Sequence, residues 1–162
     1  MEDLIKQVRE LETKTTELQT MSADRDFTLT VSNSQELKAI LKLIDTKYRW
    51  ESKNAALTVH VYDTLKTAAN DAVTTEEGLQ LSLKATIMTG MYNILLNIEG
   101  SGVEQARSFI KILTNVGHQV SDAMNVLASD NQEIQGLHAR IHELEQQIEQ
   151  TNEISEQIEE EA

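Results

Sequence analysis

Two histidines, at positions 138 and 142, form the arrangement in the sequence that most resembles a metal site. Side chains four residues apart lie on the same face of a helix, so two imidazoles at this spacing could chelate a divalent cation. Glu145 and Glu149 extend that face and could complete the coordination. The simpler interpretation is a pair of exposed polar residues beside a hydrophobic seam. We therefore expect no metal or cofactor. If a metal did bind, His138 and His142 would be its ligands.

The remaining residues that could perform chemistry are scattered along the chain. His60 and His118 have no evident partner in the sequence, and no serine lies in the pattern of a nucleophile elbow. The Gly-Ser-Gly at 100–102 is not followed by the lysine that a phosphate-binding loop requires. We therefore expect that the protein is not an enzyme.

The composition favours long helices. The 162 residues include no proline and no cysteine, 40% are hydrophobic and only 4% are aromatic. Proline breaks helix interiors, so its absence permits long uninterrupted helices. The absence of cysteine removes disulfides and thiolate chemistry.

The charge is strongly negative and unevenly distributed. The net charge is −13, and residues 133–162 contain nine glutamates against the single Arg140, a net of −8. Such a surface repels phosphates, so we expect no direct binding of nucleic acid.

Residues 1–10 lack the features of a signal peptide, and Lys84 interrupts the most apolar stretch, 79–98. We expect no membrane contact and a cytoplasmic or virion-associated protein.

The most regular pattern in the sequence is a C-terminal heptad repeat. β-branched residues occupy one seam and leucines the other, which favours a parallel two-stranded coiled coil. In such a dimer Arg140 would face Glu145 of the other chain. The expected interface residues here are Ile134, Leu137, Ile141, Leu144, Ile148 and Ile158.

A shorter amphipathic helix is expected over residues 1–22. Its apolar positions are Leu4, Val8, Leu11 and Leu18, and Thr15 fills the remaining seam position. About three heptads are too short for independent stability, so this helix needs a partner. The partner is either its own copy in a second chain or the C-terminal arm, and the sequence leaves both open.

The residues between these helices predict a mainly helical body. Residues 27–31 alternate as a strand does, and the mate would be either 57–61 or the same strand of a second subunit. Residues 55–69 fit helix or strand, with helix favoured. A helix is expected to follow a capping-box-like start at 32–35, because residues 37, 40, 41 and 44 have helical spacing and Tyr48 lies one turn on. Another helix is expected over 76–98, after a capping box of Thr74 and Glu77. The Gly-Ser-Gly at 100–102 would then turn the chain into an antiparallel helical hairpin.

The expected fold class is therefore mainly α: a helical hairpin or bundle body, an N-terminal amphipathic helix and a long C-terminal coiled coil. The expected segments are 1–22, a body over 27–130 and an arm over 131–162. Asp130 interrupts the seam. It either caps a new helix after a hinge or lies within one continuous helix, and we favour continuity.

The leading functional hypothesis is a self-associating structural or interaction protein, such as an assembly factor, a scaffold or an accessory component of a larger complex, including one of a virus or phage. Its expected partners are itself, as a parallel homodimer or higher oligomer, and another protein. The alternative is an acidic inhibitor or nucleic-acid mimic that binds a basic site on another protein.

Overall fold

The computed structural model describes residues 1–161, of which most are helical: the chain is 78% helix with one small three-stranded sheet. The mainly α fold class is confirmed. The chain divides into two compact units. The arm consists of Met1–Asp24 and residues 126–161, and the head consists of Arg25–Asn125.

In the head, a three-stranded antiparallel sheet has the order β1-β3-β2, with β1 at Asp26–Val31, β2 at Val73–Thr75 and β3 at Gly78–Lys84. Leu29 of β1 is opposite Leu81 of β3, and both are fully buried. The alternate residues Thr28 and Ser82 are exposed. The sheet therefore has one apolar face, as the period of two requires.

Helices α2 (Ser34–Lys47), α3 (Ala55–Asn70) and α4 (Ala85–Leu96) pack on this apolar face, together with residues 109–124 of α5 (Val103–Glu161). A short 3-10 helix, η1 (Ser52–Asn54), precedes α3. The helix expected to follow residues 32–35 is confirmed, although its capping box is one residue later than expected. Asn33 accepts a hydrogen bond from the Glu36 backbone N–H, and Glu36 accepts one from the Ser32 N–H.

Residues 55–70 form α3, so the possible strand at 57–61 is wrong. A strand would place Leu57, Val59 and Val61 on one face. Instead Val61 and Leu65, one helical turn apart, are fully buried, whereas Leu57 and Val59 are exposed. Gly90 of α4 permits the close approach of α3, because a Cβ there would lie 2.9 Å from Val61 Cγ2.

The expected helix over 76–98 is wrong in its first half. Residues 73–84 form the β2–β3 hairpin. The strand expected over 27–31 is present as β1, but its mate is β3 and neither of the two expected mates, residues 57–61 or the same strand of a second subunit. Thr74 lies in β2 and therefore caps no helix, and Thr75 accepts a hydrogen bond from the Glu77 N–H within the turn. Gly78 has a φ of +134°, and a Cβ there would lie 2.3 Å from the Val31 carbonyl oxygen. Only residues 85–96 are helical, and this helix, α4, is central in the core as expected.

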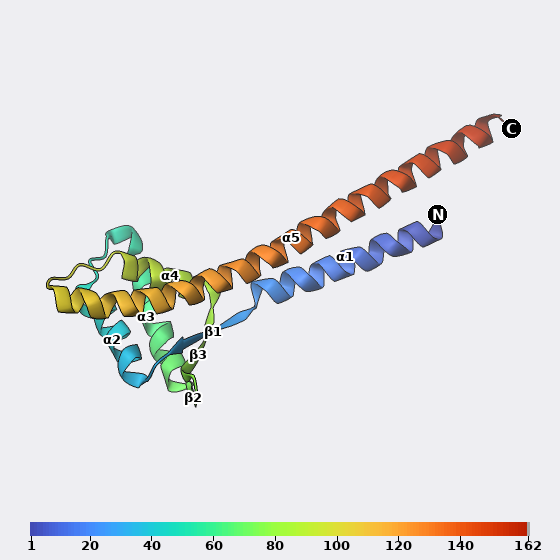
Figure 1. Cartoon of the computed structure of the whole chain (residues 1–162). Helices are drawn as coiled ribbons and strands as arrows, with labels where there is room; N and C mark the ends of the chain where they lie inside the picture. The colour runs from blue at the N-terminus through green and yellow to red at the C-terminus, as the bar shows by residue number, and fades with distance from the viewer. Residues whose placement is uncertain (162) are drawn as a thin grey trace. The chain divides into compact units, whose positions relative to one another are not determined.

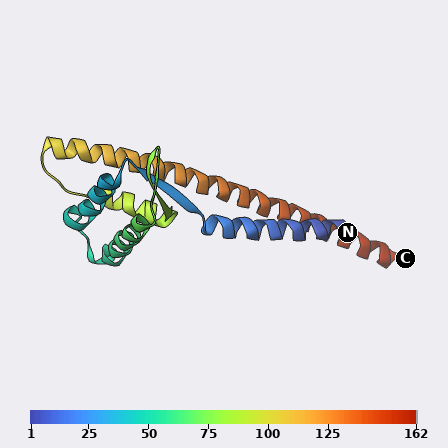
Figure 2. The same cartoon turned by 90° about the horizontal axis from the view of Figure 1, so that it is seen from below.

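In the arm, α1 (Glu2–Ala23) lies alongside the C-terminal part of α5, as Figures 1 and 2 both show. α5 is one helix of 59 residues, so the expected continuity through Asp130 is confirmed.

The turn expected at 100–102, between α4 and α5, is also confirmed. Within the head, Thr89 contacts Met124 and Tyr92 contacts Gly117, so α4 and α5 run antiparallel as expected.

Candidate functional site: the paired helices of the arm and a groove in the head

The arm is an antiparallel pair of helices with a regular seam. On α1 only residues 4, 8, 11, 15, 18 and 22 are buried or half-buried, and on the part of α5 from 128 to 161 only residues 130, 134, 137, 141, 144 and 148 are. Both sets have the alternating four-and-three spacing of a coiled coil. Val8, Ile141 and Leu144 form the buried centre, against which Leu4, Leu11 and Ile148 pack.

The two repeats match layer by layer when α1 is read in the opposite direction to α5. A hydrogen bond of 3.0 Å from the Ser22 hydroxyl to the Asp130 carboxylate fixes one end of the register, and the Val8 cluster fixes the other. We assign the six layers as Leu4–Ile148, Val8–Leu144, Leu11–Ile141, Thr15–Leu137, Leu18–Ile134 and Ser22–Asp130.

The polar residues of the seam have partners. Asp130 is 8% exposed and accepts the Ser22 hydrogen bond, which explains how a carboxylate occupies a seam position. The hydroxyl of Thr15, which is 3% exposed, donates to the Leu11 carbonyl at 2.6 Å. These two layers are therefore satisfied without a second chain.

The structure places the expected interface residues in the seam between α1 and α5 of the same chain, except Arg140, Glu145 and Ile158, which are exposed. Within the arm, α1 pairs with the C-terminal part of α5, which is one of the two alternatives that the sequence left open. Arg140 pairs with Glu143 of its own helix at 2.8 Å, and both side chains are about half exposed or more. Its expected contact with Glu145 of another chain stays a prediction, as does the parallel homodimer.

The two histidines of the metal hypothesis each contact a glutamine. His138 lies 3.4 Å from Gln19 of α1, and His142 lies 3.3 Å from Gln146, measured between side-chain nitrogens. Within residues 1–161, no three His, Cys, Asp or Glu side chains are grouped so that they could hold a metal ion.

The last part of α5, residues 151–161, lies beyond the layers that contain α1, and Figure 2 shows it extending past the N-terminus of α1. We call residues 151–161 the tail segment. Every one of its side chains is exposed, including Ile154 at 57% and Ile158 at 63%. It also contains five glutamates and no lysine or arginine. Ile158, an expected interface residue, therefore has no layer partner on α1.

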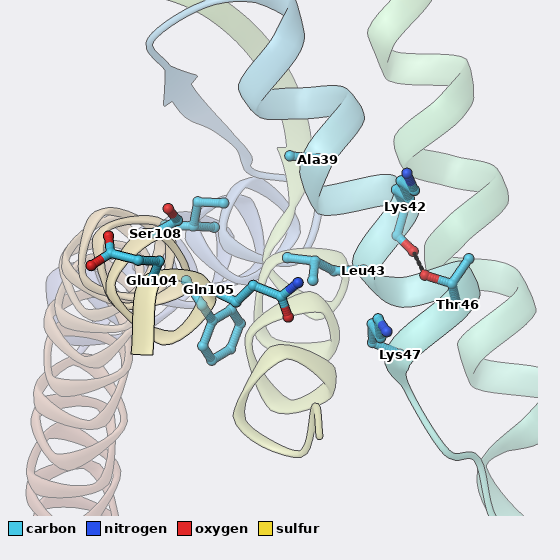
Figure 3. Close-up of a pocket in the computed structure, with 10 residues that line it drawn as sticks. Ala39, Lys42, Leu43, Thr46, Lys47, Glu104, Gln105 and Ser108 are labelled. Atoms are coloured by element: carbon cyan, nitrogen blue, oxygen red, sulfur yellow. Dashed lines mark hydrogen bonds between the residues drawn. The ribbon is translucent and has the colours of Figure 1, made fainter. Parts of the chain in front are cut away.

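A groove in the head, which the sequence analysis missed, runs between α2 and the first turns of α5. Its volume is about 480 Å³, and a neighbouring hollow of about 320 Å³ continues it toward Gly100. Leu43 of α2 and Phe109 of α5 line both hollows, which therefore adjoin, and we call the two together the groove. Figure 3 shows Leu43 facing Gln105 across it, with Lys42 and Lys47 on the α2 side.

The groove combines an apolar floor with a basic wall. Leu43, Phe109 and Ile112 are half-buried rather than exposed. Lys42 and Lys47 are exposed, and the ion pairs found among residues 1–161 involve neither of them. In the sequence, the groove is indicated only by the two lysines near Leu43 on one helix. The sequence does not show that these residues line a groove, because the opposite wall lies about sixty residues further along the chain.

Side chains of α5 also cover the outer edge of β1. The Gln119 carboxamide accepts a hydrogen bond from the Thr30 N–H at 2.6 Å and donates one to the Thr30 carbonyl at 2.8 Å. Asn115 donates a second bond to that carbonyl at 3.1 Å. Gln119 thus satisfies the same two backbone groups that a neighbouring strand would, which protects an edge prone to pairing with other chains.

Comparisons with protein-family models, curated proteins and solved structures found no match for this chain. Among residues 1–161, no helix is both long enough and apolar enough to cross a membrane.

Proposed function

We propose that the protein is a non-enzymatic, self-associating coiled-coil protein that serves as a structural or interaction component of a larger assembly. The observation that supports this most directly is the exposure of Ile154 and Ile158 in the tail segment. Both are large apolar side chains one helical turn apart, on a helix that has no partner beyond residue 148 within the described chain.

The seam over residues 134–148 is occupied by α1, so the contact between chains is assigned to the tail segment. A parallel homodimer through 134–148 would first have to displace α1 from the six layers. The tail isoleucines are available without that cost. Burying them fully would contribute about 1.5–3 kcal/mol each.

The proposal is tested by measuring the molar mass of the protein by light scattering over a range of micromolar concentrations. We expect the mass to rise with concentration, and the double variant Ile154→Gln/Ile158→Gln to stay monomeric. Glutamine is at least as good a helix former as isoleucine, so this variant keeps the helix. The matched control, Asn152→Gln/Glu156→Gln on the opposite face, should associate like the original chain.

A wild-type chain that stays monomeric at every concentration would refute self-association. A double isoleucine variant that associates as well as the original would refute the tail segment as the contact.

A second candidate function is an acidic inhibitor or nucleic-acid mimic that occupies a basic site on another protein. The nine glutamates of residues 133–162, exposed wherever the structure describes them, favour it. Charge mimicry is sensitive to salt because the screening length falls to a few ångströms near 1 M. Binding to a basic partner that survives about 0.5 M salt would therefore contradict this candidate.

A further inference from the structure

The tail segment is poorly suited to pair with a second tail segment. Each copy has five glutamates and no basic residue within eleven positions. A symmetric pair of tails would bring these carboxylates close together, and like charges at a helix interface are destabilising. Two isoleucines from each chain are also a small apolar area to offset the loss of translational and rotational freedom. A favourable partner surface should therefore be apolar and basic.

The groove between α2 and α5 has both properties. Its floor contains Leu43, Phe109 and Ile112, and its α2 wall contributes Lys42 and Lys47. The carboxylate of Glu104, on the opposite wall, lies 3.7 Å from Arg107, so its charge is offset. Glu99 in the adjoining hollow is similarly paired with Arg49 at 3.1 Å. The lining itself holds two lysines and two glutamates, so the groove's excess of positive charge comes from Arg49 and Arg107, which are paired with the glutamates.

We propose that the tail segment of one copy docks as a helix in the α2–α5 groove of a second copy, joining the molecules head to tail. This inference rests on the proposed self-association and names its contact surface. Because Ile154 and Ile158 are exposed in the single chain, the occupant of the groove is the tail of another molecule.

The dimensions and the chemistry of the two surfaces correspond. The α5 side of the groove extends from Glu104 to Ile112, about 12 Å of helix at 1.5 Å per residue, and the tail segment, about 15 Å long, is long enough to span it. Ile154 and Ile158 would lie on the apolar floor, in the manner of a helix bound in a groove. Glu153 and Glu160, seven residues apart on one flank of the isoleucine face, would approach the lysines.

The contact joins two different surfaces, so it can be repeated. Each molecule that has docked its tail still has an open groove, and each molecule that has accepted a tail still has its own tail exposed. A head-to-tail contact of this kind forms a ring if the rotation closes and a filament if it does not. The order of assembly should therefore increase with concentration rather than stop at a dimer.

Charge reversal on each side, followed by mixing, tests the contact. We expect Lys42→Glu/Lys47→Glu and Glu153→Lys/Glu160→Lys each to raise the dissociation constant about tenfold or more, because attraction becomes repulsion. Mixing the two variants should restore association, since each groove then meets a tail of opposite charge. The control Lys38→Glu/Lys66→Glu makes the same change of net charge outside the groove and should associate normally.

A crosslink provides a direct geometric test, because the chain contains no cysteine of its own. A chain with Thr46→Cys in the groove is mixed with a chain carrying Ser155→Cys in the tail, and a mild oxidant is added. We expect a disulfide-linked heterodimer of the two chains. Thr67→Cys on α3, mixed with Ser155→Cys, is the matched control and should give little of this product.

The outcomes separate the docking contact from self-association itself. If the groove variant associates as well as the original chain while Ile154→Gln/Ile158→Gln does not, the tail binds elsewhere and the groove is refuted. If the crosslink forms equally well from position 67, the groove is refuted as well. If the original chain never associates, both this inference and the proposed function fail.

Discussion

Replacing Gln119 tests whether α5 protects the edge of the sheet. The Gln119 side chain supplies both the acceptor for the Thr30 N–H and a donor for the Thr30 carbonyl. In Gln119→Ala the carbonyl keeps its bond from Asn115, whereas the N–H of Thr30 loses the hydrogen bond that Gln119 provides. The substitution therefore removes both hydrogen bonds to Thr30, together with those that Gln119 donates to Asn115. It leaves one backbone group at the β1 edge in need of a new partner.

The expected destabilisation of the head is about 1–3 kcal/mol. Each hydrogen bond contributes about 0.5–1.5 kcal/mol net, and a donor left unsatisfied in a partly buried place adds to the cost. Gln119→Glu should cost at least as much. Its carboxylate still accepts from the Thr30 N–H, but it cannot donate to the carbonyl oxygen that the side-chain nitrogen now contacts at 2.8 Å.

Amide hydrogen exchange measured by NMR, with urea unfolding followed through signals of β1 and β3, gives the readout. The Thr30 amide should exchange roughly tenfold faster or more, since 1.4 kcal/mol corresponds to a factor of ten. Gln135→Ala, exposed on the same helix, controls for the change in helix propensity. An unchanged Thr30 exchange rate in Gln119→Ala would refute the protective role of this contact.

Two further substitutions probe the arm and the hairpin. Leu144→Ala removes a seam side chain that is 1% exposed, and it should destabilise the pairing of α1 with α5 by about 2–5 kcal/mol. The loss is measured by thermal unfolding followed by helical circular dichroism. A destabilisation below about 1 kcal/mol would contradict the layer assignment. Gly78→Ala should destabilise the head by about 1–3 kcal/mol or more in urea unfolding, because its φ is +134° and the new Cβ would contact the Val31 carbonyl oxygen. Gly100→Ala, whose Cβ would meet nothing within 4 Å, is the control and should change stability by less than about 0.5 kcal/mol.

Much of the arm could be predicted from the sequence because a seam residue is recognisable by its spacing alone. Ile141 and Leu144 follow the heptad, and both are buried as that pattern requires. The partner could not be read from this pattern, since the same spacing serves parallel and antiparallel pairs. The match of polar Ser22 with polar Asp130 indicates that α1 is the partner and that it runs antiparallel. This match is found only when the N-terminal repeat is aligned in reverse with the C-terminal one.

The sequence predicts helix over residues 76–84, which belong to the hairpin, because two periodicities overlap there. Leu79 and Leu83 are four residues apart and suit a helical face, yet Leu81 lies between them and completes an alternation of period two. Gly78 was the residue that could have decided between them, since a strained turn requires it and a helix does not. The groove was beyond prediction because its two walls are brought together only by the packing of the head.

The pairing of α1 with α5 has a consequence for the order in which the chain can fold during synthesis. Ser22 and Asp130 are separated by 108 positions, and the whole head lies between them. The apolar stripe of α1 therefore leaves the ribosome long before its partner exists, while the head can already form from contiguous residues. A short amphipathic helix is marginal on its own. A chain interrupted before residue 130 would leave that stripe in water, where chaperones or a completed neighbouring chain could bind it.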